Sequence, residues 1–140
     1  MNQVPKETIQ EIADQLGSGF RVFIHKETLE LITYPNEDKS ASFEPSTWKR
    51  EIQTVHKEKN KYVEVQGMEP HDSFRVIEDF ITTINDNLLQ ERLLNAVHQK
   101  RPFAHFKEQI DRSGVYRERW FAFRGQRMIE WVQEQLDQIL

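Results

Sequence analysis

Glu78 and Asp79 form an adjacent pair of carboxylates, and paired carboxylates can serve as a general acid and a general base. They fall on the polar face of a segment whose apolar residues repeat at helical spacing. Folding could bring His71 and His105 to this pair. In the simpler interpretation, which we favour, the two carboxylates are solvated or pair with arginines. An enzyme with an acid–base site near Glu78 and Asp79 is therefore the third alternative for function.

The histidines do not have the spacing of a metal site, which needs three or four convergent ligands. The chain has no cysteine, and its five histidines are spread over a strand, a loop and three helices: His25, His56, His71, His98 and His105. The glycine-rich signatures of nucleotide-binding loops are also absent. The sequence therefore predicts no metal and no cofactor.

The segment 100–127 has the most distinctive composition. It holds eight Lys and Arg against three Asp and Glu, a local balance of +5 in a chain whose net charge is −4. Aromatic residues alternate with these basic ones, and arginine both stacks on aromatic rings and binds carboxylate or phosphate bidentately. The candidate binding residues are Arg101, Phe103, Lys107, Arg112, Arg119, Trp120, Arg124 and Arg127.

This segment allows two interpretations. In the structural one, the aromatic residues fill the core, and the arginines pair with acids such as Glu78, Asp79 or Glu91. In the functional one, some of the arginines stand free and form a recognition surface. The structural interpretation is favoured, and the surplus of positive charge keeps the second one open.

The order of the predicted elements defines the fold class. A short helix over 5–16 precedes a β-hairpin over 20–34, a second helix over 48–59 and a third strand over 62–65. Every later pattern is helical. We therefore predict an α+β fold, with a small antiparallel sheet of about three strands in the N-terminal half covered by a helical C-terminal half. The whole chain, 1–140, is expected to form one domain, divided into a mixed part over 1–67 and a helical part over 68–140.

Three helix boundaries rest on individual residues. Ser46 is predicted to cap the helix over 48–59, and Asp72 or Ser73 to cap the first helix of the C-terminal half. Pro102 is predicted to open a helix that follows another over 87–99 after a short turn. This pair has the layout of a helix-turn-helix.

The sequence also predicts the compartment in which the protein works. Charged residues interrupt the first sixteen positions, so no signal peptide is expected, and no apolar run approaches the ~18 residues that span a bilayer. The absence of cysteine is typical of a reducing compartment. We expect a cytoplasmic protein without a membrane partner.

Four blocks of the C-terminal half recur together in a known family: Phe74–Ile81, Glu91–Ala96, Arg101–Phe103 with Phe106–Lys107, and Arg119–Arg124. In their order and spacing they resemble the uncharacterised bacterial protein family (UPF) number 0158. The resemblance implies one domain and a bacterial source, and since the family has no assigned function it carries over no catalytic residue.

The sequence departs from the family's pattern at two positions. The hairpin turn, usually Thr-Gly-Glu, reads Thr28-Leu29-Glu30, and Gln99 replaces a usual Gly before the basic pair. Leu29 therefore falls where a left-handed conformation is needed, at a strain of about 1 kcal/mol.

These observations lead to one leading function and one main alternative. The leading function is a non-enzymatic binding or adaptor domain with an Arg/aromatic-rich surface on its C-terminal helices, which binds a protein partner or a second copy of itself. The alternative is a nucleic-acid-binding regulator that uses the 87–112 helix pair, with Arg101, Lys107 and Arg112 as its basic residues.

Overall fold

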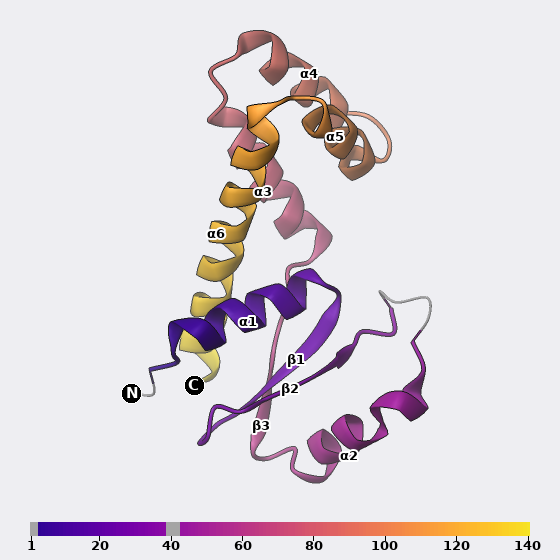
Figure 1. The fold of residues 1–140 in the computed structure, drawn as a ribbon, viewed down its shortest axis with the longest axis vertical. Coiled ribbons are helices and arrows are strands. Elements are labelled where there is room, and N and C mark those ends of the chain that lie inside the picture. The colour runs from indigo at the N-terminus through magenta and orange to yellow at the C-terminus, as the bar shows by residue number, and fades with distance from the viewer. Residues whose placement is uncertain (1–2, 39–42) are drawn as a thin grey trace. The chain divides into compact units, whose positions relative to one another are not determined.

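The computed structural model describes residues 3–38 and 43–140 and confirms the α+β fold (Figure 1). Its helices and strands are α1 (Lys6–Gly17), β1 (Phe20–His25), β2 (Leu31–Pro35), the 3₁₀ helix η1 (Pro45–Trp48), α2 (Lys49–Lys57), β3 (Tyr62–Val65), α3 (Pro70–Thr82), α4 (Asn87–Val97), α5 (Pro102–Asp111) and α6 (Val115–Ile139).

The chain divides into two compact units. Unit 1 comprises Met1–Gly67 and Met128–Leu140, and unit 2 comprises Met68–Arg127. The long helix α6 begins in unit 2 and ends in unit 1. Each unit therefore takes part of its core from the same helix.

The sheet of unit 1 has three antiparallel strands in the order β2-β1-β3. The predicted hairpin is confirmed, and Val22 on the central strand lies between Thr33 and Val65. Because side chains alternate across a strand, Val22 and Ile24 lie on the same side of the sheet. Both are fully buried.

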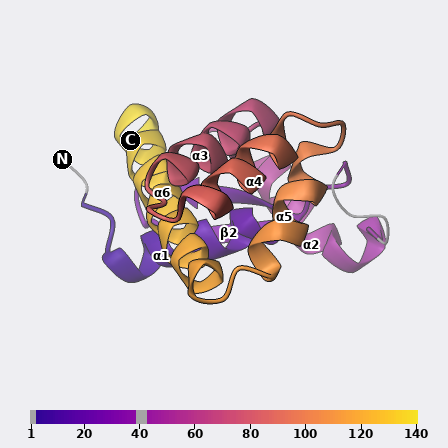
Figure 2. The same ribbon diagram turned by 90° about the horizontal axis from the view of Figure 1, so that it is seen from above.

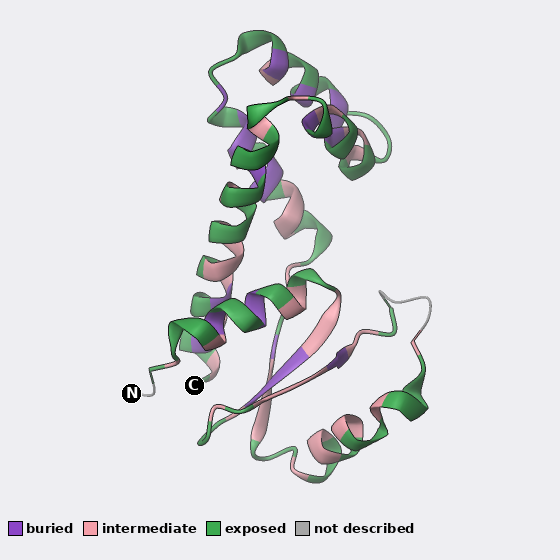
Figure 3. Ribbon diagram, viewed as in Figure 1, coloured by how far each residue is buried: buried purple, intermediate pink, exposed green. Residues whose placement is uncertain are grey.

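The core of unit 1 forms where that side of the sheet meets two helices. The buried residues that cluster with Val22 and Ile24 are Ile9, Ile12 and Ala13 of α1, Val65 of β3, and Val132 and Leu136 of α6. In Figure 3 the buried parts of α1 and β1 are purple. The apolar face of α1 therefore packs on the sheet, together with the last turns of α6.

The other side of the sheet carries a polar contact over aromatic rings. The rings of Phe23 and Tyr34 stack with centroids 5.4 Å apart. The guanidinium of Arg21 lies 5.2 Å and 5.6 Å from their centroids and binds both oxygens of Glu64 at 2.8 Å and 2.9 Å. Burial raises the pKa of Tyr34, because the charged phenolate is poorly solvated there.

Unit 2 is a helical bundle with its own core. Figures 1 and 2 show α4 and α5 side by side, joined by a short turn. The buried residues come from every helix of the unit: Val76, Ile77, Phe80, Ile81 and Ile84 from α3 and the residues just after it, Leu89, Leu93 and Val97 from α4, Phe106 and Ile110 from α5, and Trp120 from α6. Within each helix these residues recur at about the 3.6-residue helical period, which identifies the face that packs.

Two helix starts differ from the prediction. Ser46 is exposed and lies within η1, so α2 begins three residues later at Lys49, without a side-chain cap. Helix α3 begins at Pro70, earlier than predicted, because proline suits the first helical position. Asp72 therefore lies in the first turn, where its Oδ2 accepts a hydrogen bond from the backbone N–H of Glu69 at 3.0 Å.

The hairpin turn confirms the expected left-handed residue. Leu29 has φ 63°, the region in which the Cβ atom of a non-glycine residue is crowded. Its side chain nevertheless packs against the core of unit 1. The backbone strain at Leu29 therefore lowers the stability of the protein, while the packing of its side chain raises it.

We expect Leu29→Gly to be more stable than Leu29→Ala by about 1 kcal/mol, because both variants lose the packing and only glycine relieves the left-handed strain. Urea denaturation of the two variants measures the difference. An alanine variant as stable as the glycine variant would contradict the strain.

Candidate functional site

All eight candidate binding residues lie in unit 2, and two of them, Trp120 and Arg127, join its helices to one another. Trp120 is 9% exposed and packs its ring 4.9 Å from that of Phe106 and 5.2 Å from that of Phe80. Arg127 donates to Asp79 at 2.7 Å. These contacts hold α6 to α3 and α5, so neither side chain is free for a ligand.

The residues of the possible acid–base site are not brought together. Asp79 is engaged by Arg127, and Glu78 is exposed. His71 lies 3.4 Å from its neighbour Asp72. His105 lines a groove to which Glu78, Asp79 and His71 do not contribute. Within residues 3–38 and 43–140, no group of three or more His, Asp or Glu could hold a metal ion.

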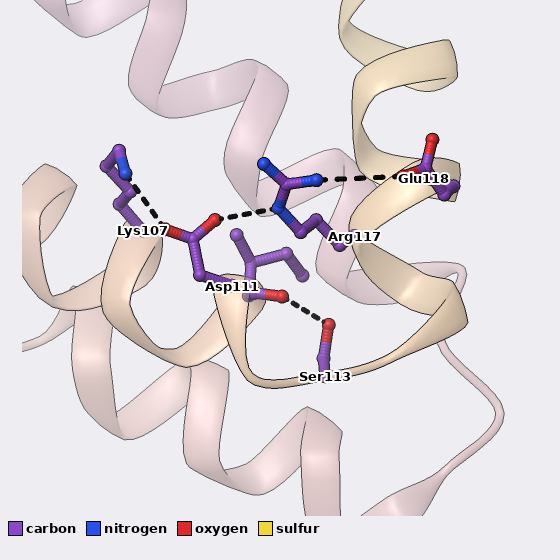
Figure 4. A network of polar contacts seen from close by, with 6 residues as sticks. Lys107, Asp111, Ser113, Arg117 and Glu118 are labelled. Carbon is purple, nitrogen blue, oxygen red and sulfur yellow. Dashed lines mark hydrogen bonds and ion pairs between the residues drawn. The ribbon is translucent and has the colours of Figure 1, made fainter.

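A network of ion pairs joins α5 to the start of α6. Figure 4 shows Lys107 and Arg117 approaching the two oxygens of the Asp111 carboxylate, at 2.8 Å and 3.2 Å, with Glu118 on the far side of Arg117 at 3.6 Å. The hydrogen bond from Lys107 and then that from Arg117 hold the pKa of Asp111 below its ordinary value. Lys107 is therefore partly neutralised.

Removing Lys107 should raise the pKa of Asp111 towards its ordinary value. In Lys107→Gln the carboxylate loses its strongest charged donor, while in the wild type the ion pairs persist until the pH falls through the lowered pKa. Carboxyl-carbon NMR titration of Asp111 measures this directly. Identical titration curves in wild type and variant would show that Lys107 does not act on this group.

Arg112 is also paired, since its guanidinium lies 3.3 Å from Glu108, one turn back on α5. The three basic residues of the helix-turn-helix hypothesis thus differ in whether an acid pairs with them. Lys107 and Arg112 each contact an acid, whereas exposed Arg101 contacts none among the described residues.

One exposed face of α6 combines arginine with an aromatic ring. Arg117, Phe121 and Arg124 recur at the spacing i, i+4 and i+7, which places them in a row; we call them the α6 ridge. The Arg117 guanidinium lies 4.7 Å from the ring centroid of Phe121. Phe121 is 42% exposed, and Arg124 has no ion pair within the part of the chain that the structure describes.

A neighbouring arginine repeats this arrangement. The guanidinium of Arg119 lies 4.9 Å from the ring centroid of Tyr116 and, among the described residues, contacts no carboxylate. On α5, Phe103 is 41% exposed and meets the ring of Phe74 edge-on at 6.3 Å. Unit 2 therefore presents both aromatic surface and uncompensated positive charge.

A groove of about 480 Å³ lies between α4 and α5. It is lined by Leu89, Arg92, Asn95, Ala96, Gln99, His105, Gln109, Arg112 and Ser113. Of these only Arg112 belonged to the predicted binding residues. The spacing of the other polar lining residues could have predicted the groove. Polar residues recur at 92, 95 and 99 on one helix and at 105, 109 and 112 on the next. Two such rows on adjacent helices of a hairpin can face one another.

The fold and these surfaces define a small α+β protein whose helical unit carries the candidate sites. Residues 44–139 match the model of an uncharacterised protein family, UPF0158. The chain belongs to this family, as its sequence blocks predicted. The match does not include the β1–β2 hairpin.

No curated protein and no solved structure matches the chain. Among the described residues, no helix combines the length and apolar character needed to span a bilayer.

Proposed function

We propose that this protein is a non-enzymatic binding domain that recognises an acidic segment of a partner protein through the α6 ridge. The observation that carries the proposal is the Arg117 guanidinium stacked 4.7 Å from the exposed ring of Phe121, with unpaired Arg124 in the same row.

The chemistry of this row suits a protein partner. Arginine and aromatic residues are enriched among the side chains that dominate binding energy. The Arg117 guanidinium stacks on the ring through its face and already pairs in its plane with Asp111 and Glu118, so it supports the ring of Phe121. Arg124 adds a full charge that no described acid neutralises. A segment with a carboxylate and an apolar side chain would satisfy both Arg124 and Phe121.

Two further features support binding over catalysis. The carboxylates and imidazoles of the possible enzyme site have separate surroundings. Unit 2 also exposes five large apolar side chains: Leu88, Leu94, Phe103, Val115 and Phe121. Exposed apolar residues beside arginine are typical of interfaces. The family resemblance and the lack of cysteine favour a bacterial cytoplasm as the place where the partner is met.

Affinity capture with matched variants tests the proposal. Wild type, the double variant Phe121→Ser/Arg124→Gln and the control Arg50→Gln are immobilised and exposed to a lysate of the source cells. Arg50 is an exposed arginine of unit 1, so it controls for the loss of one charge. We expect a partner retained by wild type and control and depleted about 30-fold by the double variant, the ratio that corresponds to a hot spot of ~2 kcal/mol. Equal capture by all three proteins would contradict the proposal.

A further double variant, Lys107→Ala/Arg112→Ala, distinguishes nucleic-acid binding from protein binding. Phosphate contacts make affinity fall steeply with salt, by about 0.9 log units per log unit of salt for each phosphate neutralised. Anisotropy titrations of duplex DNA and single-stranded RNA at two salt concentrations would show this slope. Salt-dependent binding lost in Lys107→Ala/Arg112→Ala would favour the 87–112 helix pair over the α6 ridge.

A further inference from the structure

The groove between α4 and α5 has a lining that donates hydrogen bonds and carries no carboxylate. Two arginines, three side-chain amides, one imidazole and one hydroxyl line it, over the buried apolar residues Leu89 and Ala96. Arg92 supplies one uncompensated positive charge, and Arg112 supplies a second that Glu108, 3.3 Å away, partly compensates. A site of this composition selects for an anion, because no lining group repels one.

Most of these polar side chains have no partner in the protein. Within the described residues, Arg92 makes no ion pair, and no side-chain hydrogen bond links Asn95, Gln99, His105 or Gln109 to another protein group. The Ser113 hydroxyl donates to the carbonyl of Ile110 at 2.6 Å, which leaves its oxygen lone pairs as acceptors. The donors along the groove are thus available to a ligand.

The size of the groove indicates a small molecule. Its volume of about 480 Å³ lies in the range of roughly 300–1,000 Å³ that is typical of small-ligand sites. Only two arginines line the groove, which is few for a nucleic-acid strand that carries a phosphate at every nucleotide. The lining therefore favours a compact anion over a polymer.

We infer that this groove binds a small organic phosphate monoester. Arg92 can bind the phosphate oxygens bidentately, and the two charges of the phosphate can compete with Glu108 for Arg112. Asn95, Gln99 and Gln109 can each donate and accept, so they suit a polar organic group attached to the phosphate. The site is separate from the α6 ridge and does not depend on the function proposed for it.

Calorimetric titration with defined probes tests the inference. The probes are adenosine 5′-monophosphate and ribose 5-phosphate, with inorganic phosphate, sulfate and succinate as anions that lack either the organic group or the phosphate. We expect at least one monoester to bind saturably and more tightly than all three simple anions. ¹⁵N NMR with the same ligand should shift the side-chain amide signals of Asn95, Gln99 and Gln109.

Matched variants locate the site. Arg92→Gln should weaken binding of the monoester at least about tenfold, the change expected for losing a hydrogen-bonded charge. Arg50→Gln, which removes an exposed arginine of unit 1 outside the groove, should leave it unchanged. Circular dichroism shows whether each variant is folded, and Arg92 is exposed, so its loss should not affect folding.

Four results would overturn the inference: no binding of either monoester, equal binding of inorganic phosphate, sulfate or succinate, equal loss in Arg50→Gln, or full affinity in Arg92→Gln. A single-stranded RNA that binds through Arg92 when neither monoester binds would assign the groove to a polymer instead.

Discussion

Replacing Trp120 with alanine should lower the free energy of unfolding by about 3–5 kcal/mol, the usual cost of removing a large aromatic side chain from a core. Trp120 is 9% exposed and touches aromatic rings from two other helices of unit 2, Phe80 and Phe106. Alanine would leave a cavity between α3, α5 and α6, which the surrounding helices can close only in part.

Phe121, the next residue, is the matched control. It is 42% exposed and its main contact is the Arg117 guanidinium, so Phe121→Ala should lower the free energy of unfolding by only about 1 kcal/mol. Urea denaturation followed by circular dichroism measures both variants. Similar losses in the two would contradict the division between a core tryptophan and a surface phenylalanine. That division also decides which of the two can contact a partner.

Val132→Asp should lower the free energy of unfolding by at least about 4 kcal/mol, because an unpaired carboxylate would be buried. Val132 is 0% exposed and packs in unit 1 with residues of the sheet and of α1. The neighbouring Gln133→Asp places the same charge at an exposed position and should cost little. Chemical denaturation of both variants tests this, and a stable Val132→Asp would show that the end of α6 is not part of the core of unit 1.

We also propose that the two units unfold as one domain, since α6 supplies core residues to both. The wild type has a reporter in each unit, since Trp120 lies in unit 2 and Trp131 lies in unit 1. In ¹⁵N NMR of the wild type at increasing urea, the native indole N–H signals of Trp120 and Trp131 should be lost with the same midpoint. Two separate midpoints would indicate independent domains.

The sequence predicted those parts of the fold that depend on local periodicity. The hairpin, the apolar stripe of α1 and the buried residues of α4 follow from spacing along one segment, and a short window is enough to detect it. The left-handed turn at Leu29 was also predictable, because the family's usual residue there is glycine. Helix starts were less accurate, since Pro70 competed with Asp72 and Ser73 for the first turn of α3.

The sites were harder to predict, because they depend on which helices meet. Asp79 pairs with Arg127, 48 residues away, and no local pattern selects that partner among several acids. The groove required the facing rows of α4 and α5 to be recognised together, so Arg92, Asn95, Gln99 and Gln109 were missed. Trp120 and Phe121 are adjacent, and the sequence alone did not show which was buried.

Site-specific photo-crosslinking in the source cells tests the proposed recognition surface most directly. A photoreactive phenylalanine analogue replaces Phe121 on the α6 ridge and, as a control, exposed His56 on α2 of unit 1. We predict a discrete crosslinked protein from position 121 that is absent from position 56 and is lost when Arg124→Gln is added. No crosslink at 121, or the same crosslinks from both positions, would contradict a binding surface on α6.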